Sequence, residues 1–209
     1  MLRETFPVGP LRCNCSILAD EVSREAMVVD PGDDIPKILA FVAQHQLKVK
    51  QIVITHAHID HIAGAQRLKE ITGAPVLYNK ADLMLVSIMG IQASWLGIET
   101  PDVREPDSDL PEASTLSVGG LCATIMHTPG HTPGSICLYL PDQNLLLAGD
   151  TLFAGSVGRT DLPGGDETTL LRSIHQKLLV LPGETEVIAG HGGPSRIEIE
   201  KAQNPFLQT

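Results

Sequence analysis

Apolar residues along this chain occur in two arrangements, as short uninterrupted runs and as stripes that recur at helical spacing. The runs are bounded by turns rich in Gly, Pro, Asn or Asp, as expected of strands buried in a sheet. They predict strands at residues 13–18, 26–29, 51–54, 114–118, 121–126, 136–140, 144–147 and 186–188.

The helical stripes predict two amphipathic helices. One covers residues 34–46, and the other covers residues 167–179, with Leu170, Leu171, Ile174 and Leu178 on the buried face of the second. Shorter helices are expected over residues 62–71, ending near Gly73, and over residues 80–89. Residues 100–112, rich in Pro and Asp, predict a loop. Strands followed by a helix occur in both halves, so the halves resemble each other weakly.

Length and composition limit the class of protein. The chain has 209 residues, of which 43% are hydrophobic, so it can bury a substantial core as a single domain over residues 1–209. A net charge of −10 argues against a nucleic-acid partner, which would require a basic face.

The sequence also indicates a cellular compartment. Residues 1–6 contain a charge pair and no apolar signal segment, and no stretch approaches the roughly 18 apolar residues of a membrane span. The four cysteines lack CxxC spacing, and Cys13 and Cys15 are best interpreted as small buried hydrophobic residues. We therefore expect a cytoplasmic protein without a membrane partner; the oligomeric state stays open.

Four side chains that can bind metals follow the strand at residues 51–54 directly: His56, His58, Asp60 and His61. Imidazole is a versatile metal ligand, and a neighbouring carboxylate suits a hard or borderline divalent cation. His56 and His58 point the same way on an extended backbone. Asp60 and His61 lie where the chain turns into a helix, so the segment can begin two metal sites.

Three more candidates lie in Gly-rich turns further along: His131, Asp150 and His191. Asp150 and His191 each follow an apolar run, and loops after buried strands present functional groups from a rigid scaffold. Seven donors at strand ends make two sites of about four ligands each, if Asp150 bridges them.

The order HxHxDH, then His, Asp and His, resembles the metallo-β-lactamase superfamily. Within it, residues 128–134 (TPGHTPG) and 149–153 (GDTLF) resemble glyoxalase II, the hydroxyacylglutathione hydrolases. Residues 157–166 (VGRTDLPGGD) and 204–207 (NPFL) are similar to short bacterial glyoxalase II-like proteins. The resemblance implies an α/β fold, an αββα sandwich of two mixed sheets flanked by helices.

The resemblance also implies a ligand set for two divalent ions, zinc first, with iron and manganese as alternatives. It assigns His56, His58 and His131 to one ion and Asp60, His61 and His191 to the other, with Asp150 as the bridge. A hydroxide shared by two cations is a nucleophile at neutral pH. Asp60 could orient this bridging hydroxide, and is the expected catalytic residue. The net charge of such a site favours an anionic substrate, and the resemblance implies that this substrate is a small thioester.

Two residues outside the ligand set are also expected to contribute. Arg159 is predicted to bind a substrate carboxylate. Asp30 is either a turn residue or the acceptor for the N–H of a ligand histidine. His45 and His175 are expected to be solvated on helices, and His127 to be structural.

The sequence departs from full-length glyoxalase II in three ways. We expect the C-terminal helical domain that binds glutathione to be absent, and Gly193 and Asp161 stand where that family has substrate-contacting tyrosines. The hydrolytic ligand set is complete, whereas the features that recognise glutathione are not.

Alternatives to the thioesterase remain open. A persulfide dioxygenase would hold one iron with His56, His131 and Asp150, and it shares residues 158–161 (GRTD). A lactone or ester hydrolase needs similar activation of the carbonyl. A scaffold without activity is disfavoured by the complete ligand set.

Overall fold

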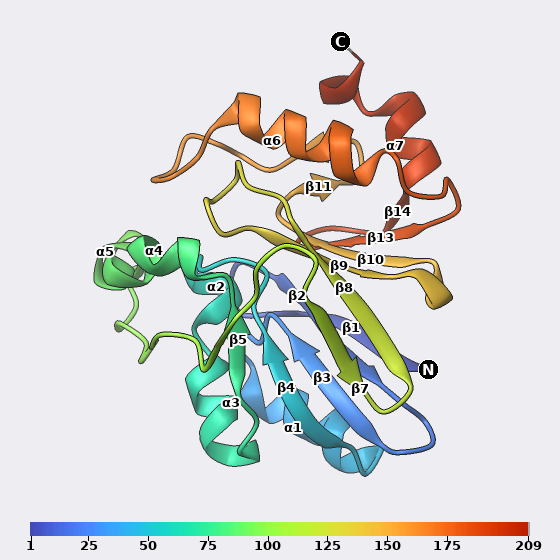
Figure 1. Ribbon diagram of the computed structural model, residues 1–209. Helices are drawn as coiled ribbons and strands as arrows, with labels where there is room; N and C mark the ends of the chain where they lie inside the picture. The colour runs from blue at the N-terminus through green and yellow to red at the C-terminus, as the bar shows by residue number, and fades with distance from the viewer. Residues whose placement is uncertain (209) are drawn as a thin grey trace.

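Two six-stranded sheets stack face to face in the computed structural model, which describes residues 1–208 (Figure 1). The first sheet has the strand order β1-β2-β3-β4-β5-β6. The three strands β1, β2 and β3 pair antiparallel, and the pairs from β3 to β6 are parallel. The bounds are β1 (Leu2–Val8), β2 (Cys13–Ala19), β3 (Glu25–Val29), β4 (Lys48–Val53), β5 (Val76–Tyr78) and β6 (Ser108–Asp109).

The second sheet has the order β14-β13-β10-β9-β8-β7 and is antiparallel except for the pair β10 and β13. A small hairpin of β11 (Leu152–Phe153) and β12 (Ser156–Val157) stands apart from it. The bounds are β7 (Thr115–Val118), β8 (Leu121–His127), β9 (Ile136–Leu140), β10 (Leu145–Gly149), β13 (Glu186–Ala189) and β14 (Ser195–Arg196).

Helices cover the outer faces of both sheets, which confirms the predicted αββα sandwich (Figure 1). The first sheet carries α1 (Ile35–Gln44), α2 (Ile59–Ile62), α3 (Ala65–Thr72), α4 (Leu83–Ser87) and α5 (Met89–Leu96). The second carries α6 (Glu167–Ser173), continued by a π-helical turn, η3 (Ile174–Leu178), and α7 (Ile197–Gln203). Short 3₁₀ turns are η1 (Lys80–Asp82), η2 (Pro141–Gln143) and η4 (Pro205–Leu207).

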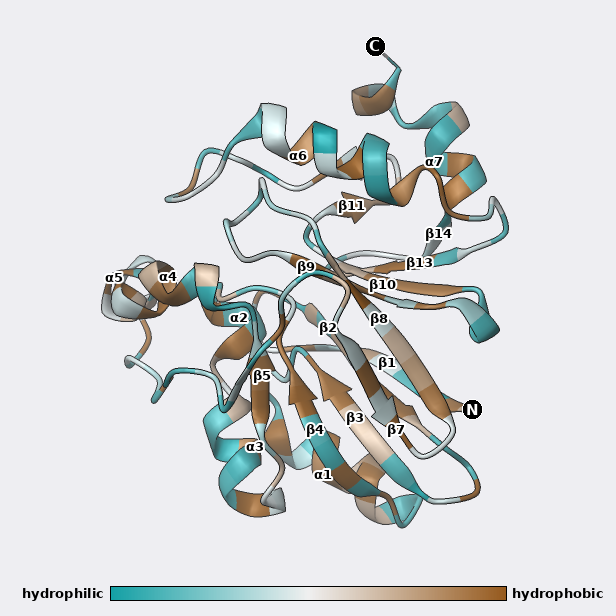
Figure 2. Ribbon diagram, viewed as in Figure 1, coloured by the Kyte–Doolittle hydropathy of each residue, from teal (hydrophilic) through white to brown (hydrophobic). Residues whose placement is uncertain are grey.

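Alternation along the strands builds three apolar layers. In β10, Leu145 and Leu147 pack between the sheets, whereas Leu146 and Ala148 pack beneath the helices of the second sheet. This alternation is expected when successive side chains point to opposite faces and both faces are covered. Figure 2 shows the resulting brown stretches along β10 and β5, whereas α3 and α6 mix teal and brown.

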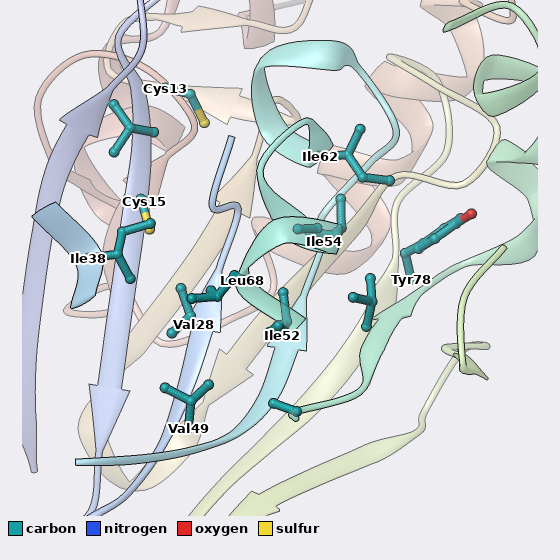
Figure 3. Close-up of a cluster of buried hydrophobic side chains, with 14 of the residues drawn as sticks. Cys13, Cys15, Val28, Ile38, Val49, Ile52, Ile54, Ile62, Leu68 and Tyr78 are labelled. Atoms are coloured by element: carbon teal, nitrogen blue, oxygen red, sulfur yellow. The ribbon is translucent and has the colours of Figure 1, made fainter. Parts of the chain in front are cut away.

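The helical face of the first sheet holds the third layer (Figure 3). Cys15 of β2, Val28 of β3 and Ile52 of β4 lie there in one cluster with Ile38 of α1. Cys13 and Cys15 are buried free thiols, which confirms their interpretation as small core residues.

The predicted helix over residues 62–71 is divided into α2 and α3. At the break, a Cβ on Gly64 would lie 2.2 Å from the carbonyl oxygen of Pro31, so the chains approach too closely there for any side chain. The predicted helix over 80–89 is likewise interrupted, as η1 and α4, and α5 continues to Leu96.

The two-residue strands β11, β12 and β14 were not predicted. Three strands of the first sheet, β1, β5 and β6, were not predicted either, and β6 lies inside the expected loop over 100–112. These strands lie at or next to an edge of the first sheet, and β5 and β6 are only three and two residues long. Their pairing comes from neighbours already in place rather than from a strong local pattern. In residues 1–208 no helix is both long and apolar enough to cross a membrane.

Candidate metal centre

All seven predicted donors converge at one edge of the sandwich, on loops that follow β4, β8, β10 and β13. Because β3 and β4 are parallel, and β10 and β13 are parallel, each pair ends at a single edge of its sheet. The carboxyl ends of parallel strands are the usual place for ligands in such sheets. Residues separated by up to 135 positions meet there: His56, His58, Asp60, His61, His131, Asp150 and His191.

The first cluster consists of three buried imidazoles, His56, His58 and His131. Nε2 of His56 lies 3.1 Å from Nδ1 of His58, and Nε2 of His131 lies 3.2 and 2.9 Å from these atoms. Ligands around a tetrahedral zinc at 2.0–2.1 Å stand about 3.3 Å apart, which the three nitrogens match closely. Burial lowers the pKa of His58 to about 3 and also lowers that of His56 and His131, so their lone pairs are free to bind a cation.

The second cluster consists of Asp60, His61 and His191. Oδ2 of Asp60 lies 3.1 Å from Nε2 of His191 and 3.7 Å from Nε2 of His61. Although burial opposes ionisation, the two neighbouring imidazoles hold the pKa of Asp60 below its usual range. An ionised carboxylate between two histidines is a suitable cation ligand.

Asp150 lies between the two clusters. Its Oδ1 is 3.5 Å from Nε2 of His61, and its Oδ2 is 3.6 Å from Nε2 of His131 and 3.7 Å from Nε2 of His191. A single carboxylate therefore reaches both clusters, as a bridging ligand must.

The donor atoms fit metal ions better than they fit one another. Within residues 1–208, the buried atoms Nε2 of His61 and Oδ1 of Asp150 have no hydrogen-bond partner. An unsatisfied buried polar atom costs roughly 1–3 kcal/mol, which a coordinated cation would offset. Five imidazoles and two carboxylates suit zinc, iron or manganese.

Asp30 lies behind His61, as expected of a residue that orients a ligand histidine. Its Oδ2 lies 3.0 Å from Nδ1 of His61, and its two oxygens accept hydrogen bonds from the N–H and the hydroxyl of Thr55, both at 2.7 Å. A proton held on Nδ1 leaves the Nε2 lone pair directed at the cluster. Asp30 adopts a left-handed backbone conformation with φ of 53°, so it also ends β3 in a sharp turn.

Cys13, the first residue of β2, also lies close to the imidazole of His61, with its Sγ 3.5 Å from Nδ1. Burial raises the pKa of this thiol to about 12. A neutral thiol on the Nδ1 side packs against His61 and is remote from the Nε2 atom that faces the cluster.

Two buried polar residues that hold the loops of the candidate ligands were not predicted from the sequence. Oδ2 of Asp82 accepts hydrogen bonds at 2.9 Å from the N–H of Ala57 and from the hydroxyl of Thr132, and Oδ1 accepts one at 2.5 Å from the N–H of Gly134. Gln92 accepts from the N–H of Ile59 at 3.0 Å. The only signal was a polar residue within an otherwise apolar helical segment.

Arg159 adjoins the first cluster through its backbone, because Nδ1 of His131 donates to its carbonyl oxygen at 2.7 Å. Its guanidinium is exposed and donates two hydrogen bonds of 2.7 Å to the carboxylate of Asp161. The backbone of Arg159 therefore contacts the first cluster, while the guanidinium predicted to bind substrate is already paired with the carboxylate of Asp161.

The remaining histidines lie outside both clusters, as predicted. His175 is exposed, and His127 is half-buried and bonded through Nε2 to the carbonyl oxygen of Pro133 at 2.8 Å. His45 differs from expectation, because it is half-buried and stacks on Phe41 with ring centroids 4.4 Å apart.

The sequence profile of the metallo-beta-lactamase superfamily matches residues 8–191, a range that begins before Asp30 and ends at the last donor, His191. The chain belongs to this superfamily.

Two bacterial relatives align over nearly their whole length. An uncharacterized protein of Aquifex aeolicus is 44% identical over 99% of this chain and 97% of its own. Hydroxyacylglutathione hydrolase GloC of Haemophilus influenzae is 36% identical over 99% and 98%.

Solved structures of the superfamily share the fold. BLEG-1, a B3 metallo-beta-lactamase, superposes with a TM-score of 0.93 at 34% identity, over 100% of both chains. TTHA1623 in a di-iron-bound form gives 0.88 at 36% identity, over 98% of this chain and 100% of its own. ETHE1 from Myxococcus xanthus gives 0.83 at 27% identity, over 98% and 84%.

Proposed function

We propose that this superfamily member is a two-metal hydrolase that cleaves a small anionic thioester, such as S-lactoylglutathione or a related acyl-glutathione. The observation that carries the proposal is the position of Asp150, within 3.7 Å of donor nitrogens in both three-residue clusters. A carboxylate shared in this way is the mark of a centre built for two ions.

The chain's residues would hold the first ion with His56, His58 and His131 and the second with Asp60, His61 and His191. Two divalent ions in these positions would supply a hydroxide nucleophile at neutral pH and polarise the scissile carbonyl. Thiolate is a fair leaving group, so cleavage of a thioester needs no separate general acid.

Asp60 is the residue proposed to act on the nucleophile as well as on an ion. Its side chain is 16% exposed and faces His191, and its carboxylate stays ionised because His61 and His191 favour the charged form. An ionised carboxylate that is partly exposed to solvent can orient a water for attack on the substrate.

Arg159 is proposed to bind the carboxylate of the substrate. Its guanidinium is 61% exposed and makes a bidentate pair with Asp161, and this planar fork is suited to a carboxylate. The substrate would have to compete with Asp161 for it.

The relationship to GloC of Haemophilus influenzae supports the thioester class, because that relative is named a hydroxyacylglutathione hydrolase and aligns over 99% of this chain.

A persulfide dioxygenase is the second candidate. The similar protein TTHA1623 has been solved in a di-iron-bound form, so this fold can hold the metal that the dioxygenase would use, although as one ion rather than two. A lactone or ester hydrolase is a third candidate, because ester and thioester hydrolysis need similar activation of the carbonyl.

The deciding experiment measures metal content per chain in protein purified without chelator, together with turnover of S-lactoylglutathione. We expect two ions per chain and thioester cleavage. The variant His191→Ala should retain one ion and lose turnover, whereas the exposed control His175→Ala should retain two ions and full activity.

Other outcomes reject the thioesterase in distinct ways. One iron per chain, with oxygen uptake on glutathione persulfide and no thioester cleavage, would establish the dioxygenase. Two ions without thioester cleavage, but with hydrolysis of a lactone, would replace the substrate class while keeping the two-metal centre.

A further inference from the structure

An apolar hollow adjoins the second cluster and has no part in the proposed chemistry. Its walls come from the turn between β1 and β2, the first turn of α2 and the end of α5, and it encloses about 40 Å³. The residues that matter here are Val8, Leu11, Ile59, Asp60, Leu96 and Ile98. Asp60 therefore belongs both to the hollow and to the metal centre.

The hollow is lined mainly by apolar side chains, unlike the metal centre beside it. Leu11 and Ile98 are 45% and 47% exposed although they are large hydrophobic residues, and Val8 and Ile59 form a buried floor. Exposed apolar side chains that line a concave surface beside a reactive centre are typical of a ligand pocket. The volume of the hollow is far below that of a pocket for a whole ligand, so it suits a short hydrocarbon group rather than a tripeptide.

The walls of the hollow are held in place before any ligand arrives. Gln92 of α5 accepts a hydrogen bond from the N–H of Ile59 at 3.0 Å and donates to the carbonyl oxygen of Ala57 at 3.3 Å, which ties α5 to the metal loop. The N–H of Gly9 donates to Oδ2 of Asp34 at 3.0 Å and fixes the turn between β1 and β2. Figure 1 shows α2 and α5 at the same end of the sandwich.

The hollow and Arg159 adjoin different clusters. Arg159 is joined to the first cluster through His131, and the hollow meets the second cluster through Asp60. A substrate whose scissile carbonyl lies between the two clusters would extend one end toward the guanidinium of Arg159 and the other end toward the hollow.

We propose that the hollow receives the acyl group of the substrate, so that the natural substrate is a thioester with an aliphatic acyl chain on one side of the scissile bond and a carboxylate on the other. This inference rests on the proposed function and makes it more specific.

The test compares S-acetyl-, S-butyryl- and S-hexanoylglutathione, which differ only in the length of the acyl chain. We expect kcat/KM to rise by up to about fourfold for each methylene that enters the hollow. In Leu11→Ser and Ile98→Ser the ratio of the hexanoyl to the acetyl value should fall toward one. Ile91→Ser is the matched control, because Ile91 lies on α5 and is 52% exposed, close to the 47% of Ile98, but does not line the hollow; it should keep the ratio of the native enzyme.

A binding experiment separates failure of this inference from failure of the proposed function. S-Methyl- and S-hexylglutathione are thioethers that cannot be hydrolysed, and the chain's one tryptophan, Trp95, directly precedes Leu96. We expect the hexyl compound to change Trp95 fluorescence saturably and to bind at least tenfold more tightly than the methyl compound, an advantage that Ile98→Ser removes and Ile91→Ser keeps.

Each outcome bears on one claim. Tight hexyl binding without cleavage of any thioester would overturn the proposed function and support the pocket. Cleavage at rates independent of chain length, with equal binding of the two thioethers, would overturn the pocket and leave the hydrolase. An effect of Ile91→Ser as large as that of Ile98→Ser would also overturn the assignment of the hollow.

Discussion

The carboxylate of Asp82 accepts a hydrogen bond from the hydroxyl of Thr132 at 2.9 Å, although the two residues are fifty positions apart. The same carboxylate accepts from the N–H groups of Ala57 and Gly134. Ala57 lies between His56 and His58, and Thr132 follows His131. One buried acid thus joins the two loops that carry the first cluster.

Replacing Asp82 with asparagine should therefore loosen the first cluster. The amide group can accept with one oxygen only, so it turns an N–H toward a backbone donor and leaves a buried group unpaired. We expect a loss of about 1–3 kcal/mol in the free energy of unfolding and a 10- to 100-fold loss of metal affinity. Denaturant unfolding and metal titration measure the two effects. Asp109→Asn, an exposed acid that caps the N–H of Lys80, is the control and should change metal affinity little.

Asp30 should control the other cluster in the same way. In Asp30→Asn, the amide cannot accept both from Thr55 and from His61, so His61 loses the group that holds its Nδ1 proton. Affinity for the second ion should fall 10- to 100-fold while the first ion stays bound. A titration that resolves two binding steps tests this, with the exposed Asp33→Asn as control. Equal weakening of both steps would contradict the assignment of Asp30 to His61.

Two glycines near the last donor offer a sharp steric comparison. A Cβ on Gly190 would lie 2.1 Å from Oδ1 of Asp150 and 2.6 Å from Cε1 of His61, so Gly190→Ala must displace both donors. A Cβ on Gly193 meets no atom of residues 1–208 within 4 Å. We expect Gly190→Ala to lose roughly 100-fold in kcat, since a shift of about 1 Å in a reacting group has that effect. Gly193→Ala should keep its activity, and similar losses in both variants would refute the steric argument.

The pair of Arg159 and Asp161 predicts opposite effects from two single substitutions. Removing the cation in Arg159→Ala should raise KM for an anionic substrate severalfold with little change in kcat. Asp161→Asn removes the competing carboxylate, so it should lower KM. Steady-state kinetics with one anionic and one neutral thioester provides the check, because neither substitution should alter KM for the neutral compound. A KM change of the same size for the neutral compound would place Arg159 outside substrate binding.

Removal of the metals should destabilise the fold, because His61 and Asp150 would keep buried atoms without partners. A ligand present at a hundred times its dissociation constant stabilises the folded state by about 2.7 kcal/mol, which is roughly 5–11 °C in Tm for a chain of this size. Thermal unfolding with and without chelator measures the shift. The triple variant with His56→Ala, His58→Ala and His131→Ala should show a smaller shift in Tm on adding chelator. A Tm of the native protein that chelator does not change would argue against tightly held ions.

The layers of the fold and the seven candidate donors could be predicted from the amino-acid sequence alone. Periods of two and 3.6 residues are local properties, so the central strands and the two amphipathic helices follow from them. The donors could also be identified from sequence, because each follows an apolar run and strand ends bring loops to a common edge. Helix interruptions could not be foreseen, since the break at Gly64 depends on the distant Pro31.

The residues that support and surround the candidate donors became known only from the tertiary structure. Asp82, Gln92 and the hollow beside Asp60 involve residues far apart along the chain, and nothing in their local sequence distinguishes them from ordinary helix and turn residues. It also showed the guanidinium of Arg159 already paired with Asp161. Local sequence encodes which face a side chain takes, whereas hydrogen bonds and cavities between distant segments exist only once both segments are packed.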